Sequence, residues 1–168
     1  MTKEVILLYL ITEGSIKQNN DAITNLYECQ RLVDLIEQNA DELTRNFMRD
    51  VRIHAATPTY HTWDENELYE RAYNVYSQLG KWISRETSKE EIAQHYRELG
   101  VQRRKEGFSL SEVILAIIKT RRHLWLKILG EGLLDTVLDH SQAMELNNRV
   151  ILFFDRAIYY TILGYEGR

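Results

Sequence analysis

The chain has 168 residues, of which 44% are hydrophobic and 27% are charged, and its formal net charge at pH 7 is -4. This length predicts one domain over residues 1–168, long enough to bury most of the surface that the unfolded chain exposes. The mildly acidic balance argues against a nucleic-acid-binding protein, because such proteins usually carry a basic surface.

The first apolar segment is the run of seven residues from Val5 to Ile11. It is too short to span a bilayer, which takes about 20 apolar residues, and its flanks lack the pattern of a signal peptide. We therefore expect no membrane association. A run of this length is typical of a short buried helix or of a strand. We favour a helix, because the remaining sequence contains no second strand candidate to pair with it.

The rest of the chain predicts one helix after another. The single proline, Pro58, separates two helical stretches, and the breaks between helices are short enough for neighbours to pack antiparallel. The break between residues 38 and 41 is weakly marked, so the first two helices form either a pair or one bent helix. The expected helices span residues 20–38, 41–56, 64–85, 88–106, 109–129 and 137–164.

Three of these helices have starts that the sequence encodes as capping boxes. In a capping box, the side chains of the cap and of the third helical residue accept hydrogen bonds from each other's backbone N–H groups. Glycines mark two helix ends, as expected for left-handed caps: Gly107 ends one helix, and Gly130 with Gly132 the next. The sequence thus predicts an all-α single-domain bundle of about five to six mostly antiparallel helices, with a globin-like or four-helix-bundle-like core. The capping pairs are Asp64 with Glu67, Ser88 with Glu91, and Ser109 with Glu112.

Three charged residues occupy helix positions that hydrophobic periodicity assigns to the interior. They are Arg103, Arg121 and Asp155, each on the apolar face of a different predicted helix. A buried charge is costly unless it is paired and hydrogen-bonded. From the expected antiparallel register we predict an Arg103–Asp155 ion pair inside the bundle. Arg121 would then bond to Glu145 or Asn148.

Two interpretations of these charges stay open. They are either structural ion pairs and snorkelling side chains, or one arginine, with Arg121 as first candidate, binds an anionic group of a ligand between the helices. The polar and aromatic connector at residues 60–63 is a further segment that can line a site. The candidate ligand-binding residues are Arg103, Arg121, Trp125 and Asp155.

No constellation in the sequence predicts an enzyme, a metal site or a named cofactor. The histidines lack the Glu-x-x-His and His-Glu-x-x-His spacings of di-iron bundles and zinc hydrolases. Cys29 has no evident neighbouring base, and Gly-x-Ser-x-Gly, Walker and Rossmann signatures are missing. As the single cysteine it excludes an intrachain disulfide and fits a cytoplasmic protein. The alternative to a non-enzymatic module is a helical protein that binds haem or another planar cofactor through a histidine.

The last predicted helix is apolar nearly all round between Val150 and Leu163. Such a helix must be buried on every side, either at the centre of the domain or against a partner molecule. We expect a homodimer in which the side opposite Asp155 forms a two-fold contact. The residues of this predicted contact are Leu146, Val150, Phe153, Ala157 and Tyr160.

Four patterns of spaced hydrophobic, glycine and arginine positions stand out in the sequence: Leu79-Gly80-x-Trp82-Ile83, Tyr96-x-x-Leu99-Gly100-x-x-Arg103-Arg104-x-x-Gly107, Leu110-Ser111-Glu112-Val113-x-x-Ala116 and Arg121-Arg122-x-Leu124-Trp125. Together they resemble the N-terminal sensory domain of RsbRD-type RsbT co-antagonist proteins, over roughly residues 42–165. The resemblance implies a helical bacterial signal-input domain that is dimeric and cytoplasmic, with an undefined ligand and no catalytic residues. Its recurring charged positions match Arg103, Arg104, Glu112 and Arg121, and the resemblance implies no ligand role for them.

The expected function is therefore that of a non-enzymatic sensory or regulatory module. A small ligand or a protein partner, such as a kinase or an anti-sigma-type regulator, would shift the helix packing and with it the exposed C-terminal helix. No phosphoacceptor or kinase module follows the last predicted helix in this sequence. We accordingly expect the domain to act in trans, or to be an excised input module.

Overall fold

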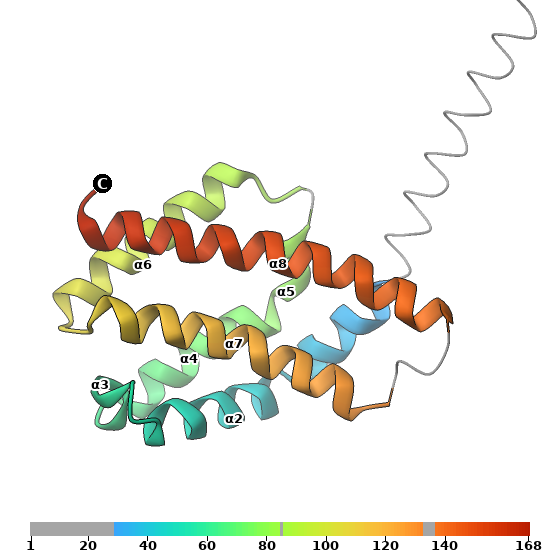
Figure 1. Cartoon of the computed structure of the whole chain (residues 1–168), viewed down its shortest axis with the longest axis horizontal. Coiled ribbons are helices and arrows are strands. Elements are labelled where there is room, and N and C mark those ends of the chain that lie inside the picture. The colour runs from blue at the N-terminus through green and yellow to red at the C-terminus, as the bar shows by residue number, and fades with distance from the viewer. Residues whose placement is uncertain (1–28, 85, 133–136) are drawn as a thin grey trace, which may run out of the picture.

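The structure is a computed structural model that describes residues 29–84, 86–132 and 137–168, and every element among them is a helix (Figure 1). The predicted all-α class is confirmed for these residues. The expected helix at Val5–Ile11 and the beginning of the 20–38 helix lie outside the described residues. Residues 29–38 are helical, and they are followed by α2 (Ala40–Ile53), α3 (Pro58–His61), α4 (Glu65–Ser77), α5 (Leu79–Ile83), α6 (Lys89–Lys105), α7 (Leu110–Gly130) and α8 (Val137–Glu166).

Helix α7 lies in the middle of the bundle. It packs against α8 on one side and against α2 on the other, while α6 pairs with α8 and α4 pairs with α2 (Figure 1). Among the described elements, none of the helices combines the length and the hydropathy needed to cross a lipid bilayer.

The helix starts follow the predicted caps. Asp64 accepts a hydrogen bond from Glu67 N at 2.9 Å, and Ser88 accepts one from Glu91 N at 3.0 Å. The capping box at Ser109 is complete, because the Glu112 side chain also accepts from the backbone N–H of Ser109 at 3.0 Å. The remaining two caps use only the cap side chain, so the sequence pattern overstates their reciprocity.

The ends of the helices also agree in part with the glycine signals. Gly107 has φ +87° and Gly132 has φ +64°, which is the left-handed conformation expected after a helix end. Gly130 instead remains within α7 as its last residue. The weakly marked break near residue 39 is a real one, since Asn39 leaves the helical conformation with φ -105° and ψ 19° and α2 starts after it.

The predicted 64–85 helix is divided into α4 and α5 at Gln78, which has φ -123° and ψ 25°. The restart of α5 leaves backbone N–H groups without partners inside the helix. A carboxylate from another element meets one of them: Gly80 N donates to Glu37 Oε1 at 2.8 Å. This long-range cap explains why local sequence signals do not show the break.

Helices α6 and α8 cross with their backbones in direct contact at two glycines. A Cβ atom added to Gly100 would collide with the carbonyl oxygen of Thr161 and would lie 2.7 Å from Tyr165 N. A Cβ atom added to Gly164 would collide with the carbonyl group of Arg97. Only glycine permits this approach, so the two positions set the distance between the helices.

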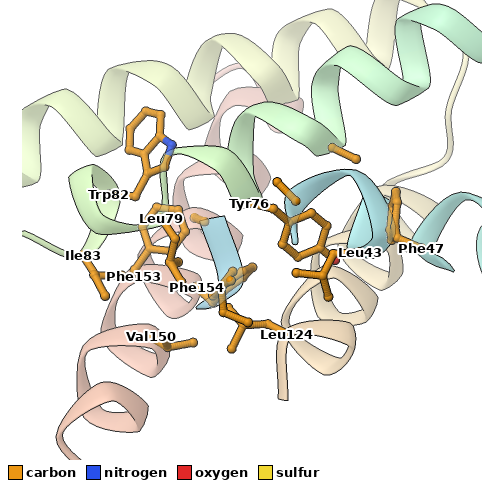
Figure 2. Close-up of a cluster of buried hydrophobic side chains, with 14 of the residues drawn as sticks. Leu43, Phe47, Tyr76, Leu79, Trp82, Ile83, Leu124, Val150, Phe153 and Phe154 are labelled. Carbon is orange, nitrogen blue, oxygen red and sulfur yellow. The ribbon is translucent and has the colours of Figure 1, made fainter. Parts of the chain in front are cut away.

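The core joins side chains from every described helix, and Figure 2 shows part of it. The indole of Trp82 stacks on Phe153 with ring centroids 5.8 Å apart, and Tyr96 meets the same ring edge-on at 5.7 Å. Such pairs stabilise a core by roughly 0.5–1.5 kcal/mol beyond their area burial. The hydroxyl of Tyr76 donates to the carbonyl of Thr120 at 3.0 Å, which ties α4 to the centre of α7.

Candidate ligand cavity and the charges around it

A small cavity lies inside the bundle, where side chains of α4, α6 and α7 meet. Its volume is about 70 Å³. A wider cavity of about 400 Å³ lies between α4 and α6 next to it. The two share Arg71, Val75, Tyr96, Leu99 and Arg103 as lining residues, so we describe them as the inner cavity and its mouth.

The walls change in character from the inside outwards. The inner cavity is lined chiefly by apolar and aromatic side chains, whereas the mouth carries more polar ones. Such a gradient is typical of sites for small organic ligands, which combine apolar walls with a few placed polar groups. Besides the shared residues, the inner cavity is lined by Phe47, Tyr60, Leu68, Ala72, Val113, Ala116, Ile117, Thr120 and Phe154, and the mouth by Asn74, Gln78, Trp82, His95, Glu98 and Gln102.

Two arginines and one carboxylate form an ion cluster at the junction of the two cavities. Arg71 binds Glu106 with both terminal nitrogens, at 3.0 and 2.7 Å. Arg103 Nη1 donates to Glu106 Oε2 at 2.7 Å. Gln102 adds a fourth bond to the same carboxylate at 2.9 Å. Glu106 is therefore fully occupied, and the cluster has one more positive charge than negative charge.

Arg103 is the most buried of these groups, at 6% exposed. A guanidinium has five N–H donors, but within the described part of the chain Arg103 donates one side-chain hydrogen bond, to Glu106. Its Cζ also lies 5.3 Å from the ring centroid of Phe108. Arg103 thus presents unused donors beside a cavity.

Two tyrosine hydroxyls share this property. Tyr60 and Tyr96 line the inner cavity and are each 3% exposed, and neither hydroxyl has a hydrogen-bond partner among the described residues. Burial raises the pKa of both side chains above the usual range, so both hydroxyls stay neutral and keep their protons. The hydroxyls therefore remain available as donors and acceptors.

The structure separates Arg103 from the other candidate ligand-binding residues. Arg121 faces Asp155 across the α7/α8 surface at 3.6 Å, with side chains 30% and 63% exposed. Trp125 is partly buried against the core, and it does not line the inner cavity or its mouth. Of the four residues, only Arg103 lies at the cavity.

Both predicted pairings of the interior charges are wrong. Arg103 pairs with Glu106 on its own helix, and Asp155 pairs with Arg121. Glu145 instead pairs with Arg149, one turn further along α8. Periodicity identifies the face on which a side chain lies, but not how far one helix is shifted along its neighbour. An axial error of about two turns is enough to exchange the partners.

The five residues that we predict for the dimer contact lie in the core of the single chain. Leu146, Val150, Phe153, Ala157 and Tyr160 are all buried, and a second copy cannot reach them without unpacking α8. The exposed apolar residues of α8 lie on the opposite side, together with exposed residues of α7. We call this surface the α7/α8 face, and its large exposed side chains are Ile118, Leu129, Met144, Ile151, Leu152 and Tyr159.

A larger groove, of about 600 Å³, lies between α2 and α7. Most of its charges are paired, while Arg49 donates to Asn46 Oδ1 at 3.4 Å. Asp50 binds Lys119 at 2.8 Å and His123 at 3.1 Å, and Lys127 binds Glu42 and Glu131 at 2.8 and 2.7 Å. The groove is therefore bordered chiefly by ion pairs, whereas the inner cavity places the nearly buried Arg103 among apolar and aromatic side chains.

The described residues contain no group of three or more His, Cys, Asp or Glu side chains placed to hold a metal ion. His123 binds a carboxylate, as described above, and Cys29 is buried. His95 lies at the mouth of the cavity, with its ring 4.9 Å from that of Trp82.

The buried carboxylate of Glu112 serves the architecture. It accepts hydrogen bonds from the backbone N–H and hydroxyl of Thr59, at 2.7 and 3.0 Å, and from both donors of Ser109. Burial opposes the ionisation of Glu112, but these four hydrogen bonds outweigh it and hold its pKa below the usual value. The charge ties the start of α7 to α3, which presents Tyr60 to the cavity.

Comparison with known proteins adds no relative: no family model, no curated protein and no solved structure matches this chain.

Sequence reasoning finds Arg103 and misses its partners. Arg103 interrupts an apolar stripe, which is a signal that periodicity can detect. Arg71 and Glu106 lie at helix positions that are ordinary for exposed charges. The sequence pattern predicts that Tyr96 is a core residue. Only the structure shows that its hydroxyl has no hydrogen-bond partner among the described residues.

Proposed function

We propose that the protein is a non-enzymatic signal-input domain, in which a small ligand in the inner cavity changes the packing of α7 and thereby the α7/α8 face. The observation that supports this function best is that one helix contributes to both places. Val113, Ala116 and Thr120 of α7 line the inner cavity, and Ile118 and Leu129 of the same helix are exposed on the α7/α8 face.

Helix α7 is suited to couple the two places, because its contacts with neighbouring elements differ between its start and its middle. Its start is fixed by the Ser109 capping box and by the bonds of Glu112 to Thr59. Its middle borders the inner cavity on one side, while the Tyr76–Thr120 hydrogen bond and the ion pairs of Lys119 and Arg121 hold its other sides. A ligand that fills the cavity gains contacts in one arrangement of α7 over another, and this difference in affinity is what shifts a conformational equilibrium.

We propose a second copy of the chain as the occupant of the α7/α8 face. The face is apolar along two helices of 21 and 30 residues, and large exposed apolar patches mark interaction sites. It also carries one acid and one base, Asp155 and Arg121. Under two-fold symmetry Arg121 of one copy meets Asp155 of the other, so the charges of the face are complementary to themselves.

The oligomeric state tests this proposal. We expect light scattering after size exclusion to give about twice the chain mass of 19.9 kDa for the wild type, and the single-chain mass for Leu152→Glu. Leu152 is half exposed on the α7/α8 face, so a charge there leaves the fold intact and is desolvated only in the dimer. The matched control is Ile53→Glu, at an exposed apolar residue on α2, which should remain dimeric. A monomeric wild type at high concentration would refute the dimer.

A second candidate function, a helical cofactor- or haem-binding protein, rests on His95. Burial lowers the pKa of His95 at the mouth of the cavity, which favours the neutral imidazole that binds metals. If a haem bound, His95 would be the residue that holds it at the cavity mouth, and the haem would supply redox or gas-binding chemistry. An absorption spectrum after reconstitution with haem separates the two functions: a Soret band that His95→Ala removes supports the second, and its absence rejects it.

A further inference from the structure

The polar groups of the inner cavity point to an anionic ligand. Arg103 is buried and uses one of its donors on Glu106, while Glu106 has no capacity left because Arg71 and Gln102 also bind it. None of the nitrogens of Arg103 is among the fully buried unpaired atoms of the described residues, so its remaining N–H groups are accessible from the cavities, where an acceptor can bind them. The second acid near the cluster, Glu67, is 3.4 Å from Arg71 and is more than half exposed, so it neutralises the outer side of the cluster.

The side chains that line the two cavities indicate what the rest of the ligand looks like. Phe47, Tyr60, Tyr96 and Phe154 line the inner cavity from four different elements, and Tyr96 continues into the mouth, where Trp82 also stands. Aromatic side chains favour edge-to-face and offset-stacked contacts with other rings. The unused hydroxyls of the two tyrosines add donors and acceptors in the same space. The inner volume of about 70 Å³ excludes a bulky body.

We propose that the inner cavity and its mouth bind a small aryl carboxylate. The carboxylate takes the remaining donors of Arg103 beside Glu106. The ring spans the junction of the inner cavity and its mouth beside Tyr96 and Leu99, because the inner volume of about 70 Å³ alone is too small for it. This inference rests on the proposed function, because it names the class of ligand for the cavity of the signal-input domain. The geometry assigns Arg103, and not Arg121, as the arginine that recognises the anion.

Calorimetric titration with three probes tests the class. The probes are phenylacetate, its neutral counterpart 2-phenylethanol and the aliphatic carboxylate hexanoate. We expect phenylacetate to bind about 10- to 100-fold more tightly than 2-phenylethanol, as for hydrogen bonds to a charged group. Hexanoate should bind more weakly than phenylacetate, because it lacks the ring.

Three variants locate the site. Arg103→Gln should abolish the preference for phenylacetate over 2-phenylethanol, whereas Arg121→Gln removes the same charge on the α7/α8 face and should leave it unchanged. Ala116→Leu places extra methyl groups in the inner cavity and should reduce the binding of all three probes. This variant keeps the test valid if Arg103→Gln does not fold.

The outcomes that overturn the inference differ from those that overturn the proposed function. If phenylacetate and 2-phenylethanol bind equally well, the ligand need not be an anion. If hexanoate binds as tightly as phenylacetate, the ligand need not contain a ring. The cavity remains a ligand site in both cases. Binding that survives Ala116→Leu rejects this location. No binding of any probe at millimolar concentration rejects both the ligand class and the cavity as the input site.

Discussion

Replacing Gly100 with alanine is expected to lower the free energy of unfolding by about 3 kcal/mol or more, measured by chemical denaturation. Overpacking usually costs 1–3 kcal/mol, because side chains can yield. At Gly100 the added Cβ meets the backbone of Thr161 and Tyr165, which cannot yield without moving α8. Gly164→Ala should have a similar effect, since its Cβ meets the backbone of Arg97.

The matched control for both glycines is Gly130→Ala. Gly130 is also helical, at the end of α7, and nothing lies within 4 Å of its added Cβ. Because alanine restricts the unfolded chain more than glycine does, we expect this variant to be unchanged or more stable by about 0.5 kcal/mol. Equal stability of Gly100→Ala and Gly130→Ala would show that α6 and α8 do not touch at these glycines.

Glu112→Gln is expected to lower the free energy of unfolding by about 2–4 kcal/mol at pH 7. The carboxylate accepts four hydrogen bonds from Thr59 and Ser109, and a hydrogen bond to a charged group contributes a net of about 1.5–3 kcal/mol. Glutamine keeps one acceptor oxygen, and its NH₂ group faces donors. The variant should therefore loosen α3 from the start of α7.

The effect of Glu112 should depend on pH. Its pKa is lower in the folded protein than the usual value of 4.5, so the unfolded state binds the proton more readily. The stability that the charge contributes is then complete above the unfolded pKa, and it is lost as the pH falls through the folded pKa. We expect the difference in stability between wild type and Glu112→Gln to shrink below about pH 4.5, in urea denaturation series at each pH.

Glu91→Gln is the control for this pair of measurements. Glu91 has the same position in α6 that Glu112 has in α7, but it is exposed, and its carboxylate pairs with Lys81 at 3.2 Å. We expect a change below about 0.5 kcal/mol, as for other exposed ion pairs. An equal loss in both variants, or a difference for Glu112→Gln that does not change with pH, would contradict the account of the buried carboxylate.

Local signals in the sequence are enough to find most helix starts. Asp64, Ser88 and Ser109 act as caps because a short polar side chain can reach a backbone N–H two or three residues ahead, whatever the rest of the chain does. Gly107 is equally local, since its positive φ is a property of one residue. The break at Gln78 is different in kind. It depends on Glu37, which lies 43 residues from Gly80 in the sequence.

Arrangement in space is harder to predict than helix boundaries. The apolar face of α7 shows that Arg121 lies near α8, but the partner of Arg121 depends on the axial shift between the helices. Such shifts depend on particular contacts, as where Gly100 against the backbone at Thr161 sets how α6 and α8 meet, and periodicity does not report these contacts. For the same reason the predicted dimer surface lies on the wrong side of α8. A helix that is apolar all round does not show which side its own chain covers, and the structure buries the side of Phe153 and leaves that of Leu152 exposed.

The candidate site likewise has one feature that the sequence shows locally and others that depend on the arrangement in space. Arg103 is detectable because one charge interrupts an apolar stripe. The unused donors are not detectable, because they are defined by what surrounds Arg103, Tyr60 and Tyr96 in three dimensions. The burial of a charged side chain is a property of packing, and the nearly buried Arg103 distinguishes this cavity from the larger groove between α2 and α7, where Arg49 is exposed.

The coupling between the cavity and the α7/α8 face is the centre of this account, and amide hydrogen exchange with and without phenylacetate tests it most directly. We predict that the ligand slows exchange in the middle of α7, around Thr120. It should also change exchange in α8 around Met144, ten residues before Phe154, which is the α8 residue that lines the inner cavity. Changes confined to α4 and α6, with α7 and α8 unaffected, would contradict a signal-input function.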